Sequence, residues 1–168
     1  MPYNLHIFVN SVEFIAKVID TLKLAPEAVK VVCSTSGERR QENQRKLGNA
    51  YPIGQPFDPA KKINFYTSTC FEGCDIFDPD GVTFIVSDGR KAHTLLDIST
   101  LFTQICGRIR DSRYKAQIVH VYSTTKYSKA VTLDEFVAAT QRTLADAESY
   151  AAEINSLSEA TRVKTLSK

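Results

Sequence analysis

The sequence predicts an α/β protein: a three-layer α/β/α sandwich around a mainly parallel sheet of about five or six strands. Two observations carry this prediction. Apolar runs of the kind that is buried on both faces of a sheet recur along the chain, at residues 5–9, 29–33, 63–67, 82–86 and 118–122. Helical patterns lie between several of these runs, and parallel neighbours need such crossover connections.

Three helices are predicted between the strands, over residues 12–22, 39–47 and 95–105. The first two follow capping-box patterns, in which a polar residue is followed three positions later by a glutamate. These pairs are Asn10 with Glu13 and Thr35 with Glu38. We therefore expect each helix to begin directly behind the carboxyl end of a strand.

A third capping box, Thr132 with Glu135, precedes a long amphipathic pattern. The predicted organisation is one α/β domain over residues 1–131, a helix over residues 132–156, and a tail or linker over residues 157–168. The helix either packs on the domain or bridges to a neighbouring one.

Composition limits the classes of function. The chain has 168 residues, with 21 basic against 19 acidic ones, so net charge alone does not indicate a polyanion partner. Its apolar runs are too short to span a bilayer, and its start lacks the pattern of a secretory signal. We therefore expect an intracellular, cytoplasmic protein without a membrane role. No zinc-type cysteine spacing is present, so no metal site is expected, and no GxxxxGK[ST] phosphate loop occurs.

Small polar residues collect where the predicted strands end. In a parallel sheet these positions share the carboxyl edge, where ligands bind. Their hydroxyl and amide groups, with helix N-termini behind them, suit phosphate oxygens. For Asn10 and Thr35, capping alone explains the residue equally well. The candidates for contact with a phosphate backbone are Asn10, Ser11, Ser34, Thr35, Thr67, Ser68 and Thr69.

Two stretches carry a family resemblance. Residues 67–76 read TSTCFEGCDI and residues 104–110 read QICGRIR. In order, separation and strand context they resemble motifs V and VI of DEAD/DEAH-type superfamily 2 helicases and translocases. Residues 5–11 are similar to motif IV, and the polar helix at 39–45 lies where the family carries a segment that faces nucleic acid. The resemblance covers residues 5–123.

The resemblance implies a second, C-terminal RecA-like domain of a nucleic-acid-dependent ATPase. The domain closes over ATP and Mg²⁺, which an N-terminal RecA-like domain holds with its phosphate loop, so this chain alone is not expected to hydrolyse ATP. It also grips DNA or RNA, with DNA favoured. The resemblance assigns catalytic roles to Gln104, Arg108 and Arg110, and nucleotide-binding roles to Gly73, Asp75 and Gly107. The arginines stabilise the charge of the transferring phosphoryl group.

Two alternatives stay open. Many members of the family place the second arginine three residues after the first, whereas this chain has Arg108, Arg110 and Arg113. Either Arg110 takes the role in a GRxR variant, which we favour, or Arg113 does. The alternative function is a non-catalytic module that keeps the fold and binds nucleic acid or protein. Retention of Gln104 with the arginines argues against that alternative.

Overall fold

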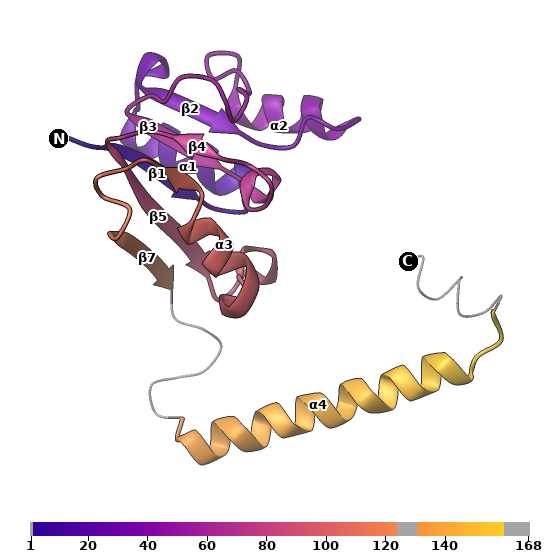
Figure 1. Ribbon diagram of the computed structural model, residues 1–168. Helices are drawn as coiled ribbons and strands as arrows, with labels where there is room; N and C mark the ends of the chain where they lie inside the picture. Colours follow the sequence, from indigo (N-terminus) through magenta and orange to yellow (C-terminus); the bar gives the residue numbers. More distant parts are fainter. Residues whose placement is uncertain (1, 124–130, 160–168) are drawn as a thin grey trace. The chain divides into compact units, whose positions relative to one another are not determined.

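The computed structural model describes residues 2–123 and 131–159. It contains a five-stranded, all-parallel sheet in the order β2-β3-β1-β5-β7 (Figure 1). Helices follow several of the strands, so the predicted α/β class and parallel sheet are confirmed. The strands are β1 (Asn4–Phe8), β2 (Val29–Val32), β3 (Ile63–Tyr66), β5 (Gly81–Asp88) and β7 (Ile118–Ser123), and they match the five predicted runs.

One face of the sheet packs against two helices, α1 (Val12–Leu22) and α2 (Arg39–Leu47). Ile15 and Ile19 of α1 and Leu47 of α2 are buried against alternate residues of the strands, such as Phe65. Apolar burial of this kind is the main favourable term in folding. Because α2 is otherwise polar, it contributes only its last residue to this core.

The other face is covered by the segments between β3 and β5 and between β5 and β7 (Figure 1). These segments include β4 (Ile76–Phe77), α3 (Thr103–Cys106) and β6 (Ile109–Arg110). Ile76, Ile105 and Ile109 are buried against the sheet, where Phe8 and Tyr66 are fully enclosed. Since β4 and β6 pair with each other in parallel, they form a separate two-stranded ladder on this face.

Several local predictions need correction. The N-cap of α1 is Ser11, whose Oγ accepts the Phe14 N–H at 3.2 Å, and not Asn10. The helix α2 begins at Arg39 behind Glu38, without a side-chain cap, so Thr35 caps nothing there. Ser34 and Ser36 bond to each other instead, and this turn takes the chain from β2 into α2.

The predicted helix over 95–105 is only partly α-helical. A π-helical turn over Ile98–Phe102 leads into the short α3, and Asp97 caps it by accepting the N–H groups of Ser99 and Thr100. The ladder β4–β6 was not predicted, because two-residue strands leave no periodicity to read. Short 3₁₀ turns lie at Pro26–Ala28, Ser68–Cys70 and Ala92–Thr94.

The chain divides by its internal contacts into residues 1–126 and 127–168. The second unit contains the helix α4 (Leu133–Ser156), whose predicted capping box of Thr132 and Glu135 is present with both reciprocal hydrogen bonds. Residues 160–168 of the predicted tail lie outside the described residues. Among the helices of the described ranges, none combines the length and the apolar character that a bilayer crossing requires.

Candidate nucleotide and nucleic-acid interface

The ladder β4–β6 brings together the two stretches that carry the predicted arginine and aspartate roles. Ile76 pairs with Ile109 and Phe77 with Arg110, and the Ile76 N–H donates to the Arg108 carbonyl at 3.0 Å. We call residues 75–78 and 108–110 the arginine ladder. It is attached through Ile76 and Ile109, which are buried in the core beneath it.

Arg110 is bound to Asp75 across the ladder. Its Nε and Nη2 lie 3.0 and 2.9 Å from the same carboxylate oxygen, Oδ1. The two side chains are about half exposed, at 46% and 50%. The guanidinium carries five N–H donors, so it keeps capacity for a further anion while this pair holds its orientation.

Arg108 lies at the beginning of the ladder and is half-buried. Its Nε donates to the Gln104 carbonyl at 3.0 Å, and its Nη1 donates to the Cys74 carbonyl at 3.3 Å. Neutral carbonyls orient a guanidinium without cancelling its charge. No carboxylate therefore offsets the positive charge of Arg108 in these two contacts, whereas the Asp75 carboxylate partly offsets that of Arg110.

The remaining residues with a predicted nucleotide role lie around the arginines. Gln104 is exposed in α3, and its main chain supports Arg108. Gly73 has a φ of +65°, a left-handed conformation that side chains rarely adopt, and it turns the chain into β4. Gly107 ends α3 with an ordinary φ of −94°, so the backbone there does not itself require glycine.

Arg113, the other candidate for the second arginine, lies elsewhere. Its Nη2 is 2.8 Å from Oδ1 of Asp80, the residue directly before β5 begins. Asp80 is therefore at the amino edge of the parallel sheet, opposite the edge where ligands bind. Asp111, with a φ of +57°, lies between β6 and Arg113, and the Arg113 N–H donates to the Pro79 carbonyl at 3.1 Å.

A second feature is a cavity at the carboxyl edge of β2, β3 and β1, with a volume of about 160 Å³. We call it the carboxyl-edge cavity. All but one of the residues predicted to contact phosphate line this cavity. The exception is Thr35, which is exposed and lies outside it. It is lined by Asn10, Ser11, Val12, Ser34, Arg39, Asn43, Thr67, Ser68 and Thr69.

Internal hydrogen bonds fix the walls of this cavity. Asn10 donates to the His93 carbonyl at 2.8 Å and accepts the Ser68 N–H at 3.3 Å, so its amide is already engaged. The hydroxyls of Thr67 and Thr69 lie 3.3 Å apart. Thr67 is buried, whereas Ser68 and Thr69 are exposed, and these two offer the accessible hydroxyls.

The prediction of individual residues missed two polar members of the cavity, Arg39 and Asn43, and one apolar member, Val12. Both polar residues lie on α2, one turn apart, and Asn43 donates from Nδ2 to the Ser34 carbonyl at 3.0 Å. The signal in the sequence was the strongly polar character of α2, but polarity alone did not say which face points to the edge of the sheet. Arg39 gives the cavity a permanent positive charge.

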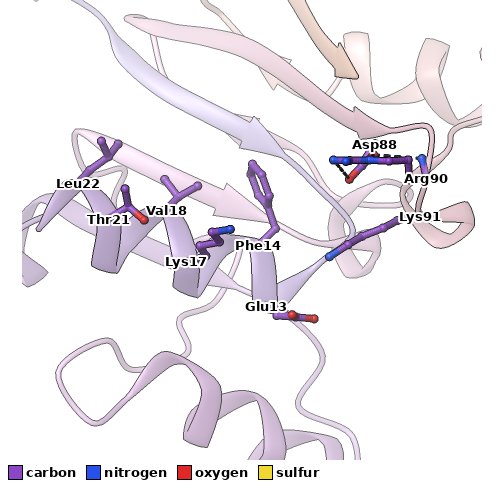
Figure 2. A pocket seen from close by; sticks show the side chains of 9 residues that line it. All are labelled: Glu13, Phe14, Lys17, Val18, Thr21, Leu22, Asp88, Arg90 and Lys91. Carbon is purple, nitrogen blue, oxygen red and sulfur yellow. Dashed lines mark hydrogen bonds and ion pairs between the residues drawn. The ribbon is translucent and has the colours of Figure 1, made fainter. Parts of the chain in front are cut away.

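A separate groove of about 480 Å³ lies beside α1 (Figure 2). Phe14, Val18 and Leu22 of α1 form its apolar side. Arg90, two residues beyond the end of β5, pairs with Asp88, the last residue of that strand. Ser123 of β7 also donates to Asp88, at 2.6 Å. This groove shares no residue with the carboxyl-edge cavity or the arginine ladder.

The cysteines and acidic residues give no sign of metal chemistry. All four cysteines are free, and burial raises the pKa of Cys33 to about 11, so its thiol stays protonated. Within residues 2–123 and 131–159, no group of three or more potential ligands is close enough to hold a metal ion.

Comparison of the chain with known protein families, curated protein sequences and solved structures gave no match. Functional inference therefore rests on the geometry of the arginine ladder and the carboxyl-edge cavity.

Proposed function

We propose that this chain is the second RecA-like domain of a nucleic-acid-dependent ATPase of the superfamily 2 helicase and translocase class. One observation carries the proposal: Arg110 and Asp75, which lie 35 positions apart in the two stretches that resemble motifs VI and V, bind each other directly. In this function Arg108 and Arg110 face the γ-phosphate of an ATP that another domain holds with Mg²⁺, and they stabilise the charge of the transferring phosphoryl group.

The carboxyl-edge cavity fits the second part of the proposal, a grip on the backbone of a nucleic acid. Its volume of about 160 Å³ is below the roughly 300–1,000 Å³ of pockets that enclose drug-sized ligands, so it suits a small group such as a phosphate. Its accessible groups are hydroxyls and the Arg39 guanidinium, which suit phosphate oxygens. We therefore expect binding that does not depend on base sequence, to DNA or RNA, with DNA favoured.

A rival function is a module that binds nucleic acid without taking part in ATP hydrolysis. The observation in its favour is that Arg110 is already paired within the domain. Arg108 weighs against it, since its guanidinium meets two carbonyls and keeps its charge. Nucleic-acid binding is common to the two functions, so only ATP turnover separates them.

The test uses the two-domain ATPase in which we propose that this chain takes part. Arg108→Ala is expected to lower nucleic-acid-stimulated ATP hydrolysis by about 10³-fold or more while the fold is kept. The matched control is Arg113→Ala, which removes an arginine at the amino edge. An Arg108→Ala variant that hydrolyses ATP at the original rate would exclude the proposed arginine role. Mg²⁺-dependent ATP turnover by residues 1–168 alone would also contradict the proposal.

A further inference from the structure

A buried polar cluster joins the last residue of the first ladder segment, Asp78, to the main sheet. His6, in the middle of β1, is fully buried, and its Nε2 is 2.8 Å from Oδ2 of Asp78, which is 5% exposed. The other ring nitrogen, Nδ1, is 3.1 Å from the hydroxyl of the buried Tyr66. Asp78 is the residue that directly follows β4. The cluster therefore links the central strand of the sheet to the end of the ladder.

The carboxylate of Asp78 is surrounded by donors. Asn4 donates from Nδ2 to Oδ2 at 3.0 Å, and the Asp80 N–H donates to Oδ1 at 2.9 Å. Burial raises the pKa of Asp78, but the hydrogen bonds from His6, Asn4 and Asp80 outweigh it, so the pKa lies below its usual value. Asp78 is therefore ionised at neutral pH.

His6 is neutral at the same pH. Burial lowers the pKa of His6 by more than the hydrogen bond and the charge of Asp78 raise it. With Asp78 ionised, the ring carries its proton on Nε2 and donates it to the carboxylate, while Nδ1 accepts the Tyr66 O–H. Every polar atom of the cluster thereby has a partner, which a buried network needs if it is to fix one arrangement.

The ladder itself is too short to fix its own position. Its main-chain hydrogen bonds include Ile76 N–H to Arg108 at 3.0 Å and Asp78 N–H to Arg110 at a long 3.4 Å. Two-residue pairing is marginal without further support. Close packing supplies part of that support, because a Cβ on Gly81 would lie 2.9 Å from Ile109 Cγ2 and 3.0 Å from the His6 ring.

We propose that Asp78, held by His6, is a positioning residue that fixes the arginine ladder and thereby aims Arg108 and Arg110. This inference rests on the proposed function for its catalytic consequence, but its geometric part does not. Asp78 acts through the main chain, since its own N–H bonds the Arg110 carbonyl and it directly follows the strand that pairs with Arg110. Its carboxylate is engaged by His6, Asn4 and the Asp80 N–H within the domain.

The first experiment measures hydrogen–deuterium exchange by NMR on residues 1–168. Asp78→Ala is expected to speed exchange of the Ile76 amide by about tenfold or more relative to the amides of Val9 and Thr67, which bond within the main sheet. Asp78→Asn is expected to restore most of the protection, because an amide can bond His6 in its other tautomer. The matched control is Asp80→Asn, which breaks the exposed pair with Arg113 nearby. If Asp78→Ala does not fold, Asp78→Ser takes its place, since its short side chain cannot reach His6.

Selective loss of protection at Ile76, with rescue by asparagine, supports the positioning role. Equal acceleration at Ile76, Val9 and Thr67 overturns it, because Asp78 then contributes only to overall stability.

The second experiment places Asp78→Ala in the two-domain ATPase. The kcat for ATP is expected to fall by about tenfold while KM changes little, since positioning acts in the transition state. An unchanged kcat overturns the catalytic consequence. The Arg108→Ala variant, assayed in parallel, distinguishes this outcome from failure of the proposed function, because Arg108→Ala must lose activity if the arginines act on ATP at all.

Discussion

Arg110 and Asp75 form an ion pair in which two guanidinium nitrogens, at 3.0 and 2.9 Å, share one carboxylate oxygen. The pair lies across the β4–β6 ladder. It joins a segment that precedes β5 in the sequence to one that follows β5. Its partners are about half exposed, so its contribution to stability is small and its main effect is on orientation.

Replacing Asp75 is therefore expected to affect activity more than folding. Asp75→Ala should change the free energy of unfolding by about 1 kcal/mol or less, as judged by urea denaturation of residues 1–168. In the two-domain ATPase the same change should lower kcat, because Arg110 loses the carboxylate oxygen that orients both of its nitrogens. A double-mutant cycle with Arg110→Gln measures the coupling, and fully additive effects on kcat would show that the pair has no joint role.

The second arginine can be identified by a pair of substitutions. Arg110→Ala is expected to lower ATP hydrolysis by about 10²-fold or more, since it removes a charge beside Arg108. Arg113→Ala should leave the rate within about twofold, because an exposed ion pair at the amino edge contributes little. Steady-state ATPase rates at saturating nucleic acid decide between them, and the reverse order of effects would assign the role to Arg113.

The carboxyl-edge cavity predicts a salt-dependent contribution from Arg39. Arg39→Ala should weaken binding of residues 1–168 to single-stranded DNA. It should also reduce the slope of log K against log salt concentration by about the amount that one phosphate contact contributes. Arg40→Ala is the matched control, because Arg40 neighbours Arg39 on α2 but does not line the cavity. Fluorescence anisotropy across a salt series measures both slopes, and equal slopes for the two variants would place the phosphate elsewhere.

The His6–Asp78 pair predicts how stability depends on pH. The pKa of His6 is lowered in the folded state by burial, so between its unfolded value of about 6.5 and its lower folded value the unfolded chain binds more protons. Stability is then complete above that window and declines as pH falls through it. The lowered pKa of Asp78 likewise makes the folded state less stable as pH falls, but at more acidic pH.

The measurement is urea denaturation of residues 1–168 between about pH 5 and pH 7.5. His6→Gln keeps a donor toward Asp78 but does not titrate, so the decline in this range should flatten in that variant. A His6→Gln variant that keeps the full decline would assign it to other groups.

The core beneath the ladder can be tested with two isoleucines of one segment. Ile105 in α3 is fully buried, whereas Ile98 is 76% exposed. Ile105→Ala should lower the free energy of unfolding by about 2–5 kcal/mol, and Ile98→Ala by about 0.5 kcal/mol or less. Urea denaturation gives both values, and similar losses would contradict the packing described for this face.

The sequence by itself determined the strands, their parallel arrangement and most of the polar residues at their carboxyl edge. These features are local: buried strands need apolar runs, and residues such as Ser34 and Thr67 follow within two residues of the strand ends. Parallel pairing then brings such residues to one edge whatever the details of the loops. The sequence-based N-cap of α1, Asn10, was wrong, because Asn10 and Ser11 are both good N-caps and only backbone geometry selects Ser11.

Only the tertiary structure decided how the arginines are held. Each strand of the β4–β6 ladder is only two residues long, so no local sequence pattern predicts it. The ladder forms because Ile76 and Ile109 are buried against the sheet. The same packing gives the two arginines different partners, because Arg110 meets Asp75 and Arg113 meets Asp80 directly before β5. It also turns His6, one polar residue within an apolar strand, into the buried partner of Asp78. Contacts between residues so distant in sequence depend on the whole chain being folded, and for that reason the sequence pattern does not contain them.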